Sequence, residues 1–217
     1  MIKFEYFEEK DFDLLINWIN SPELLVKWAG TDFNYPLDEE QLKEYIKDTN
    51  KENSSKIIYK VIIEENNSKK IIGHIALNNI DFKNCSATLG KVLVGDPQMR
   101  GQGLGPKIIK KLLKKAFEDL GLHRIELGVF AFNKSAIKSY KKIGFIKEGE
   151  KRDFRKLNGE YYNLLTNQLI FIRQENQRIV NKAQKVYKNA VIKKVSFFES
   201  MCVDYLALER YVKDLKQ

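Results

Sequence analysis

The chain has 217 residues, of which 43% are hydrophobic and 31% charged, and its formal net charge is +9. Because a domain commonly spans about 100–150 residues, this length suits one sizeable domain with an appendage. No stretch approaches the roughly 20 apolar residues that a membrane span needs, and residues 1–9 contain acids and lack the apolar core of a signal peptide. Cys85 and Cys202 are too few for a disulfide framework and lack the spacing of a metal site. We therefore expect a cytoplasmic protein with no membrane partner and no metal.

The first part of the chain predicts one strand followed by helices. Residues 4–7 indicate a strand, and residues 12–19 place Leu14, Leu15, Trp18 and Ile19 on one helical face. Ser21 and Pro22 predict a short helical turn, because serine caps helices and proline is tolerated at the first helical position. After a loop over residues 30–36, Asp38 begins another helix.

Residues 56–171 predict more strands than helices. Residues 56–64 and 70–77 indicate strands joined by a polar turn, and Asn158-Gly159 is a strong hairpin signal. The expected order is strand, two helices, three strands, helix, strand, helix, two strands. This order predicts an α/β fold with a mixed, largely antiparallel sheet flanked by helices. The remaining expected elements are strands at 87–94, 124–129, 148–157 and 161–171, and a helix at 107–120.

A glycine-rich turn lies between the strand at 87–94 and the helix that follows it. It reads Arg100-Gly101-Gln102-Gly103-Leu104-Gly105-Pro106. Glycine permits positive φ and leaves room for a ligand. The first turn of a helix offers free N–H groups and the positive end of the helix dipole, both of which suit a phosphate. Residues 104–107 are therefore placed to hold a phosphorylated ligand.

Other phosphate-binding motifs do not fit this turn, and a tight turn without a ligand remains an alternative on this stretch alone. A P-loop closes with Gly-Lys-Ser/Thr, which Gly105-Pro106-Lys107 does not supply. A Rossmann site places its glycines after the first strand, whereas here roughly half the chain precedes them.

Two motifs together resemble the GNAT N-acetyltransferase superfamily. Residues 100–105 fit Arg/Gln-x-x-Gly-x-Gly/Ala, the loop that binds the acetyl-CoA pyrophosphate in that family. Residues 133–145 resemble the family's Asn-x-x-Ala-x-x-x-Tyr-x-x-x-Gly-Phe pattern, and the two motifs occur in the expected order with a strand between them. The resemblance covers residues 1–171 and implies a GNAT-type sheet and an acetyl-CoA-dependent N-acetyltransferase.

The resemblance also implies roles for individual residues. In the family, the fourth and fifth strands separate at a bulge, and the pantetheine arm pairs with backbone groups in the opening; these correspond to Leu93 and Val94. Asn133 would contact the pantetheine arm and also cap a helix. Lys107 or Lys110 is a candidate for the 3′-phosphate of CoA, with a solvated helix face as the simpler interpretation of these lysines. The implied pyrophosphate-binding residues are Arg100, Gly101, Gln102, Gly103, Leu104 and Gly105.

The chemistry of direct acetyl transfer needs a neutral amine and a leaving thiolate that gains a proton. Tyr140 matches the family position that protonates the thiolate. The base is open: Glu126 is the leading candidate, with Asp96, His74 and a water chain as alternatives. His74 and His123 more simply fit structural roles.

The amine is less defined than the reaction. Residues 12–30 and 152–162 resemble the RimJ/RimL-like branch, which acetylates protein N-termini and small amines; Asn163 replaces an acid that relatives often have. Aromatic candidates for the acceptor end are Trp28, Phe33, Tyr35, Tyr161 and Tyr162. The acceptor is therefore a small-molecule amine or a protein N-terminus, and a non-catalytic acyl-CoA-binding sensor or subunit is the alternative.

Residues 172–217 have no place in the family pattern and predict a helical C-terminal extension with two apolar stripes. Apolar stripes of this kind must pack against another surface, which the parent domain or a partner subunit, as in a homodimer, would provide. Alternatively, the extension covers the substrate cleft or forms a separate binding module. The segment holds ten Lys/Arg and five Asp/Glu. Nucleic acid is not the favoured partner, because the main domain carries only modest positive charge.

Overall fold

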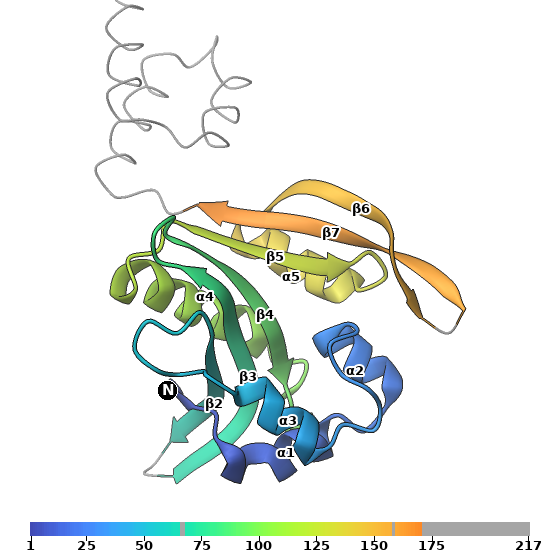
Figure 1. The fold of residues 1–217 in the computed structure, drawn as a ribbon. Helices are drawn as coiled ribbons and strands as arrows, with labels where there is room; N and C mark the ends of the chain where they lie inside the picture. The colour runs from blue at the N-terminus through green and yellow to red at the C-terminus, as the bar shows by residue number, and fades with distance from the viewer. Residues whose placement is uncertain (66–67, 158, 171–217) are drawn as a thin grey trace, which may run out of the picture. The chain divides into compact units, whose positions relative to one another are not determined.

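The structure, a computed structural model, describes residues 1–65, 68–157 and 159–170. These residues form a seven-stranded sheet with the order β1-β2-β3-β4-β5-β7-β6 (Figure 1). The predicted extension at 172–217 lies outside the described residues, and that division of the chain stays a prediction. The strands are β1 (Ile2–Tyr6), β2 (Ile57–Glu65), β3 (Ser68–Asp81), β4 (Ser86–Val94), β5 (Arg124–Phe130), β6 (Ile146–Leu157) and β7 (Glu160–Ile170).

The pairing confirms the predicted mixed sheet. The pairs β1–β2, β2–β3, β3–β4 and β6–β7 are antiparallel, whereas β4–β5 is parallel. None of the described helices is long and apolar enough to cross a membrane. The helices are α1 (Phe12–Trp18), α2 (Pro22–Ala29), α3 (Glu39–Ile46), α4 (Leu104–Lys114) and α5 (Lys134–Ile143), with short turns η1 (Glu9–Asp11), η2 (Pro97–Met99) and η3 (Lys115–Asp119).

Three helices, rather than the predicted two, separate β1 from β2. The turn expected at Ser21-Pro22 extends to the full helix α2, because the Ser21 hydroxyl accepts a hydrogen bond from the Leu24 amide at 3.2 Å and Pro22 occupies the first turn. Asp38 caps α3 in the same way, as predicted, by accepting from the Gln41 amide at 2.8 Å.

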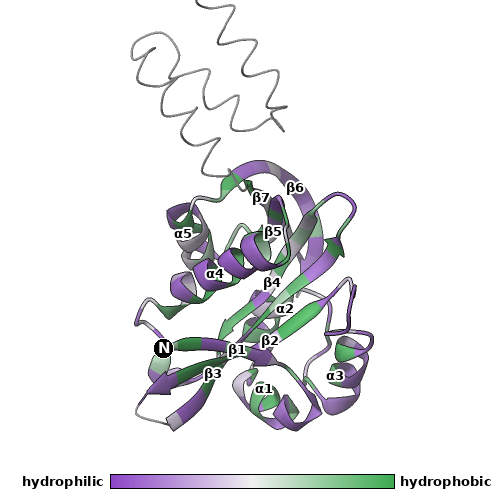
Figure 2. Ribbon diagram, turned by 90° about the vertical axis from the view of Figure 1, so that its left-hand side faces the viewer, coloured by the Kyte–Doolittle hydropathy of each residue, from purple (hydrophilic) through white to green (hydrophobic). Residues whose placement is uncertain are grey.

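The sheet separates two hydrophobic cores (Figures 1 and 2). Side chains on a strand alternate between faces, and β2 shows the result. Ile57, Tyr59 and Val61 pack with α4 and α5, whereas Ile58 packs with α1, α2 and α3. Helices therefore cover both faces of the sheet.

A buried ion pair lies on the α1–α3 face. The Lys60 ammonium is 3.0 and 2.9 Å from the two carboxylate oxygens of Asp11, and both side chains are almost fully buried. Asp11 also accepts a hydrogen bond from the Glu8 amide at 2.9 Å. This pair connects the start of the helical segment to the second strand.

The helix after the glycine-rich turn begins three residues earlier than the pattern of apolar residues predicts. Gly103 is its N-cap with φ +68°, and α4 runs from Leu104. Ile108, Ile109 and Leu112 are buried against the sheet, as the spacing predicts. The last predicted turns form η3, in which the helix widens.

Candidate active site

The fourth and fifth strands separate soon after they meet. Register pairs join Ser86 with Arg124, Ala87 with Ile125 and Thr88 with Glu126; beyond this point β4 and β5 diverge (Figure 1). On the other side of β4, His74 lies opposite Leu93 and Ala76 lies opposite Gly90, so β4 contains one extra residue. This β-bulge, at Lys91 and Val92, redirects the strand.

Two side-chain donors hold the bulge. Lys91 has φ +53°, in the left-handed region. Its carbonyl accepts a hydrogen bond from Trp28 Nε1 at 2.9 Å and lies 3.1 Å from His74 Nδ1. Because a carbonyl can only accept, Nδ1 carries the proton. Burial lowers the pKa of His74 to about 4, so the imidazole is neutral near pH 7. His74, considered as a base from the sequence, instead fixes the backbone of β4.

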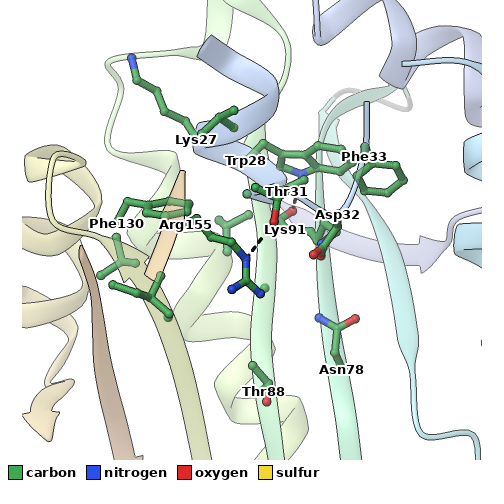
Figure 3. A pocket seen from close by; sticks show the side chains of 18 of the residues that line it. Lys27, Trp28, Thr31, Asp32, Phe33, Asn78, Thr88, Lys91, Phe130 and Arg155 are labelled. Carbon is green, nitrogen blue, oxygen red and sulfur yellow. Dashed lines mark hydrogen bonds and ion pairs between the residues drawn. The ribbon is translucent and has the colours of Figure 1, made fainter. Parts of the chain in front are cut away.

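The strand opening forms part of a cavity of about 960 Å³. Residues from β4 and β5 form its walls next to the opening, and α5 contributes Asn133, Ala136 and Tyr140. The opposite end is formed by α2, the following loop, α3 and β6 (Figure 3). From β4 and β5 the lining residues are Thr88, Leu89, Gly90, Lys91, Val92, Gly128, Val129 and Phe130.

Tyr140 and Asn133 lie at the α5 end of this cavity. Asn133 caps α5, since its side-chain oxygen accepts from the Ala136 amide at 3.2 Å. The Tyr140 ring packs edge-on against Phe145, with ring centroids 5.7 Å apart. Burial raises the pKa of Tyr140 to about 12. The phenol therefore keeps its proton at neutral pH and is available as a donor.

The glycine-rich turn presents an open surface at the start of α4. Gly101 and Gly103 have φ of +76° and +68°, which favours glycine. A Cβ added at Gly101, Gly103 or Gly105 would meet no atom within 4 Å. The turn thus leaves room for a group at the N-terminus of α4, where Leu104 and Lys107 lie in the first helical turn and a phosphate is favoured.

The Arg100 side chain binds the backbone at the end of β4. Its Nε donates to the Val94 carbonyl at 3.0 Å, and its Nη2 donates to the Gly95 carbonyl at 2.8 Å. Gln102 likewise donates to the Gln98 carbonyl at 2.8 Å. These bonds join the turn to the end of β4, so both side chains shape the loop that carries the backbone donors.

Leu93 and Val94 follow the bulge and pair with His74 and Gly73 of β3 on one edge. Their other edge faces the opening, where the described β4–β5 pairing has already ended. Backbone groups on this edge have no strand partner in β5. The pairing of this segment with an extended ligand stays a prediction.

The candidate bases lie outside the cavity lining. Glu126 is exposed at the last β4–β5 pair, where its carboxylate accepts from Thr88 Oγ1 at 3.4 Å and lies 3.4 Å from Arg124 Nη2. Thr88 itself lines the cavity. Asp96 instead accepts from the Gln98 amide at 2.9 Å and pairs with Lys70 at 2.6 Å. Among the acids considered from the sequence, Glu126 is therefore the better placed.

Sequence reasoning missed several charged residues of the cavity. Asp32 and Lys91 form an ion pair, and Arg155 donates to Thr31 Oγ1 at 3.1 Å (Figure 3). Lys91 was detectable in principle, because it is the one charged residue in the apolar run 87–94. Of the aromatic candidates, Trp28 and Phe33 line the cavity, whereas the lining does not include Tyr35, Tyr161 or Tyr162.

Comparison with known families identifies this arrangement. A family model described as an acetyltransferase (GNAT) domain matches residues 2–146, two thirds of the chain. The chain belongs to the GNAT acetyltransferase family. The predicted family is thus confirmed, and with it the predicted enzyme class: an acetyl-CoA-dependent N-acetyltransferase that transfers the acetyl group to an amine.

Relatives and a solved structure agree with this family. The uncharacterized N-acetyltransferase p20 of Bacillus licheniformis is 29% identical over 152 residues, which are 70% of this chain and 83% of p20. Acetyltransferase PseH of Campylobacter jejuni is 29% identical over 71% of this chain and 90% of its own. The crystal structure of spermidine N-acetyltransferase from Vibrio cholerae, in complex with CoA and spermine, shares the fold with a TM-score of 0.67. It is 23% identical over 78% of this chain and 95% of its own.

A second family model, described as toxin ToxN of a type III toxin–antitoxin system, matches residues 141–213, about one third of the chain. Residues 141–170 of this match form the end of α5 and the strands β6 and β7. In the described part, the matched segment therefore completes the acetyltransferase sheet.

Proposed function

We propose that the cavity between β4 and β5 holds the acetyl group of acetyl-CoA against a small-molecule amine. The observation that carries this proposal is the continuity of the lining, which runs from Asn133 and Tyr140 on α5, through the β4 bulge, to the loop after α2. Arg155 donates to Thr31 across this acceptor end. That bridge supports a small amine more than a protein N-terminus, and the RimJ/RimL-like branch stays a broader prediction.

The pyrophosphate of acetyl-CoA would lie at the glycine-rich turn. The backbone N–H groups of Leu104, Gly105 and Lys107 and the open space at Gly103 support this position. Arg100 and Gln102 would act by fixing the loop, and Gly101 by its positive φ. The pantetheine arm would run along β4 at Leu93 and Val94, on the edge that has no partner in β5, and Asn133 would contact the arm.

The chemical step would be direct attack of the neutral amine on the thioester carbonyl. A C–N bond forms, the C–S bond breaks, the amine loses one proton and the CoA sulfur gains one. Tyr140 would donate the proton to the sulfur. Glu126 would accept the amine proton through Thr88, whose hydroxyl lies between the carboxylate and the cavity. Solvent then restores both protonation states.

The cofactor loop is tested by a Gly103→Asp variant. The new carboxylate would lie beside the diphosphate, where like charges about 4 Å apart repel by about 1–4 kcal/mol. We expect CoA to bind roughly tenfold to several hundredfold more weakly, measured by isothermal titration calorimetry. Gly121→Asp is the matched control: Gly121 also has positive φ and open space but follows the other end of the α4–η3 segment. Equal loss of affinity in both variants, or wild-type affinity in folded Gly103→Asp, would contradict the loop assignment.

A further inference from the structure

The charged side chains that line the cavity are mostly cationic. Lys27, Lys56, Lys91 and Arg155 line it, against the two carboxylates Asp32 and Glu44. These residues come from α2, the loop after it, α3, β4, β6 and the start of β2, not from α4 or α5. The residues of the glycine-rich turn are not part of the lining. The phosphates of CoA therefore do not explain the positive charge at the acceptor end.

Both carboxylates already have cationic partners. Asp32 pairs with Lys91, whose side chain is only 9% exposed and lies 5.4 and 5.8 Å from the ring centroids of Phe33 and Tyr45. Glu44 pairs with Lys47 at 3.3 Å. A substrate with several ammonium groups would need carboxylates that are not already paired, and these two do not meet that need.

Arg155 points into the cavity and has no carboxylate partner among the residues that the structure describes. Its Nε donates to Thr31 Oγ1 at 3.1 Å, its Nη1 donates to the Phe154 carbonyl at 2.9 Å, and its guanidinium lies 4.0 Å from the Phe154 ring centroid. Figure 3 shows the guanidinium between Phe130 and Asp32, whereas Lys27 is directed away from it. The group is thus held in place from one side.

Lys56 adds a second cation whose ammonium contacts no described carboxylate. Its Nζ donates to the Tyr45 carbonyl at 3.0 Å and lies over the Tyr45 ring, 4.9 Å from the centroid. Burial, and next the nearby Lys91 ammonium, lower the pKa of Lys56. Asp32 and Glu44 act in the opposite direction on this pKa. With four cations against two carboxylates in the lining, positive charge is in excess at this end, and a bound anion would compensate it.

We propose that the acetyl acceptor is an amine that also carries an anionic group, a carboxylate or a phosphate, and that Arg155 binds this group. A guanidinium presents parallel N–H donors that match either anion. The inference rests on the proposed function, in which this end of the cavity receives the amine. The substrate class differs from the polyamine named for the Vibrio cholerae structure.

The test compares matched amines in a CoA-release assay with the full chain. The pairs are glucosamine with glucosamine 6-phosphate, and alanine with alaninamide; spermidine is the polycation. We expect kcat/KM for the better anionic member to exceed that of its uncharged partner by about 10- to 150-fold, the range for hydrogen bonds to charged groups. The phosphate pair and the carboxylate pair show which anion is preferred.

Variants assign this preference to the guanidinium. Arg155→Ala should remove the preference mainly by raising KM, and Arg155→Lys should retain part of it. Lys156→Ala removes a neighbouring cation that lies over the Tyr161 ring and is not part of the cavity lining, so it should keep the preference. Preference for spermidine or the uncharged amines, or a preference unaffected by Arg155→Ala, would overturn the proposal.

Calorimetric titration of the CoA-bound protein with glucosamine 6-phosphate and alanine separates this inference from the proposed function. Binding of either anion that depends on Arg155 but gives no CoA release would support the anion site while contradicting acetyl transfer to that acceptor. CoA release from the amines that lack an anionic group, without such binding, would support acetyl transfer and contradict the anion site. Absence of binding that depends on Arg155 for both anions would overturn the inference.

Discussion

The two sides of β4 differ in how the chain completes its hydrogen bonds. Toward β3 the strand is paired along most of its length, and β1, β2 and β3 continue the same antiparallel pattern between two apolar cores. Toward β5 the pairing ends at Thr88, and a cavity begins. The paired side resists change because its strands are hydrogen-bonded to one another and its apolar groups are buried. On the open side, β4 beyond Thr88 has no strand partner in β5, and we expect a ligand to take that place.

The bulge at Lys91 and Val92 connects these two regions. Trp28 and His74, both within the packed α1–α3 core or beside it, hold the Lys91 carbonyl from the closed side. The shape of the open side therefore depends on packing in the closed side. Substitutions in the two regions should consequently have different readouts: turnover for the open region and stability for the closed one.

The largest expected effect is on turnover, from Tyr140→Phe in the open region. General-acid catalysis contributes typically 10²–10⁴-fold, so kcat should fall by about that factor while acetyl-CoA affinity stays within a few-fold. Steady-state CoA release and calorimetry measure the two quantities. Tyr59→Phe also removes one phenol hydroxyl, but from the core face of β2, and it should leave kcat near the wild-type value. Unchanged turnover in Tyr140→Phe would refute the acid role.

The largest expected effect on stability comes from Asp11→Ala in the closed region. The change leaves the buried Lys60 ammonium with only the more distant Glu5 carboxylate, 4.0 Å away, and losing the close partner of a buried charge costs about 3–5 kcal/mol. For a domain of this size, Tm should fall by roughly 6–20 °C, measured by calorimetry. The exposed Asp13 on the same turn provides the control Asp13→Ala, which should change Tm little. The double variant Asp11→Leu/Lys60→Met removes both charges and should recover much of the loss; a deficit equal to that of Asp11→Ala would contradict the explanation.

A smaller effect is the pH dependence of the free energy of unfolding, through His74, which packs in the closed region and holds the bulge. The folded protein binds a proton at His74 only near pH 4, whereas the unfolded chain binds it near pH 6.5. The stability that neutral His74 contributes is therefore present above pH 6.5 and decreases as pH falls to about 4. The slope should be about 1.4 kcal/mol per pH unit. Urea unfolding across this range measures it, with His74→Asn, which keeps a side-chain N–H donor, expected to show a flatter profile. Parallel profiles for the two proteins would show that His74 does not titrate in this way.

The sequence was sufficient for the closed region because its pattern is local. Runs rich in apolar residues predicted β2 and β4, and Ser21, Asp38 and Asn133 cap helices where the sequence indicated. The third helix before β2 was missed because Ser21 and Pro22 predicted only a short turn, whereas α2 continues to Ala29. The extension of β3 to Asp81 was also missed, since Asn78 and Asn79 are poor strand formers. Asn78 pairs with Thr88 of β4, and the register shifts between Asn78 and Asp81.

The open region was predicted in outline but not in its charges. The glycine-rich turn and Tyr140 were found because their motifs are contiguous. Arg155 and Asp32 line the same cavity although they lie far apart in the sequence, and no local pattern marks them. The sequence also could not show that Arg100 folds back onto the carbonyls of Val94 and Gly95, since that geometry depends on where β4 ends.

Hydrogen–deuterium exchange with and without CoA tests most directly whether the open side of β4 is the cofactor site. Binding should slow exchange of backbone amides in residues 89–94 and 101–107, while β2 and the paired residues Arg124–Glu126 exchange as before. That pattern would support a ligand that completes the unpaired edge of β4 and lies on the glycine-rich turn. If CoA binds and neither segment gains protection, the central claim is wrong.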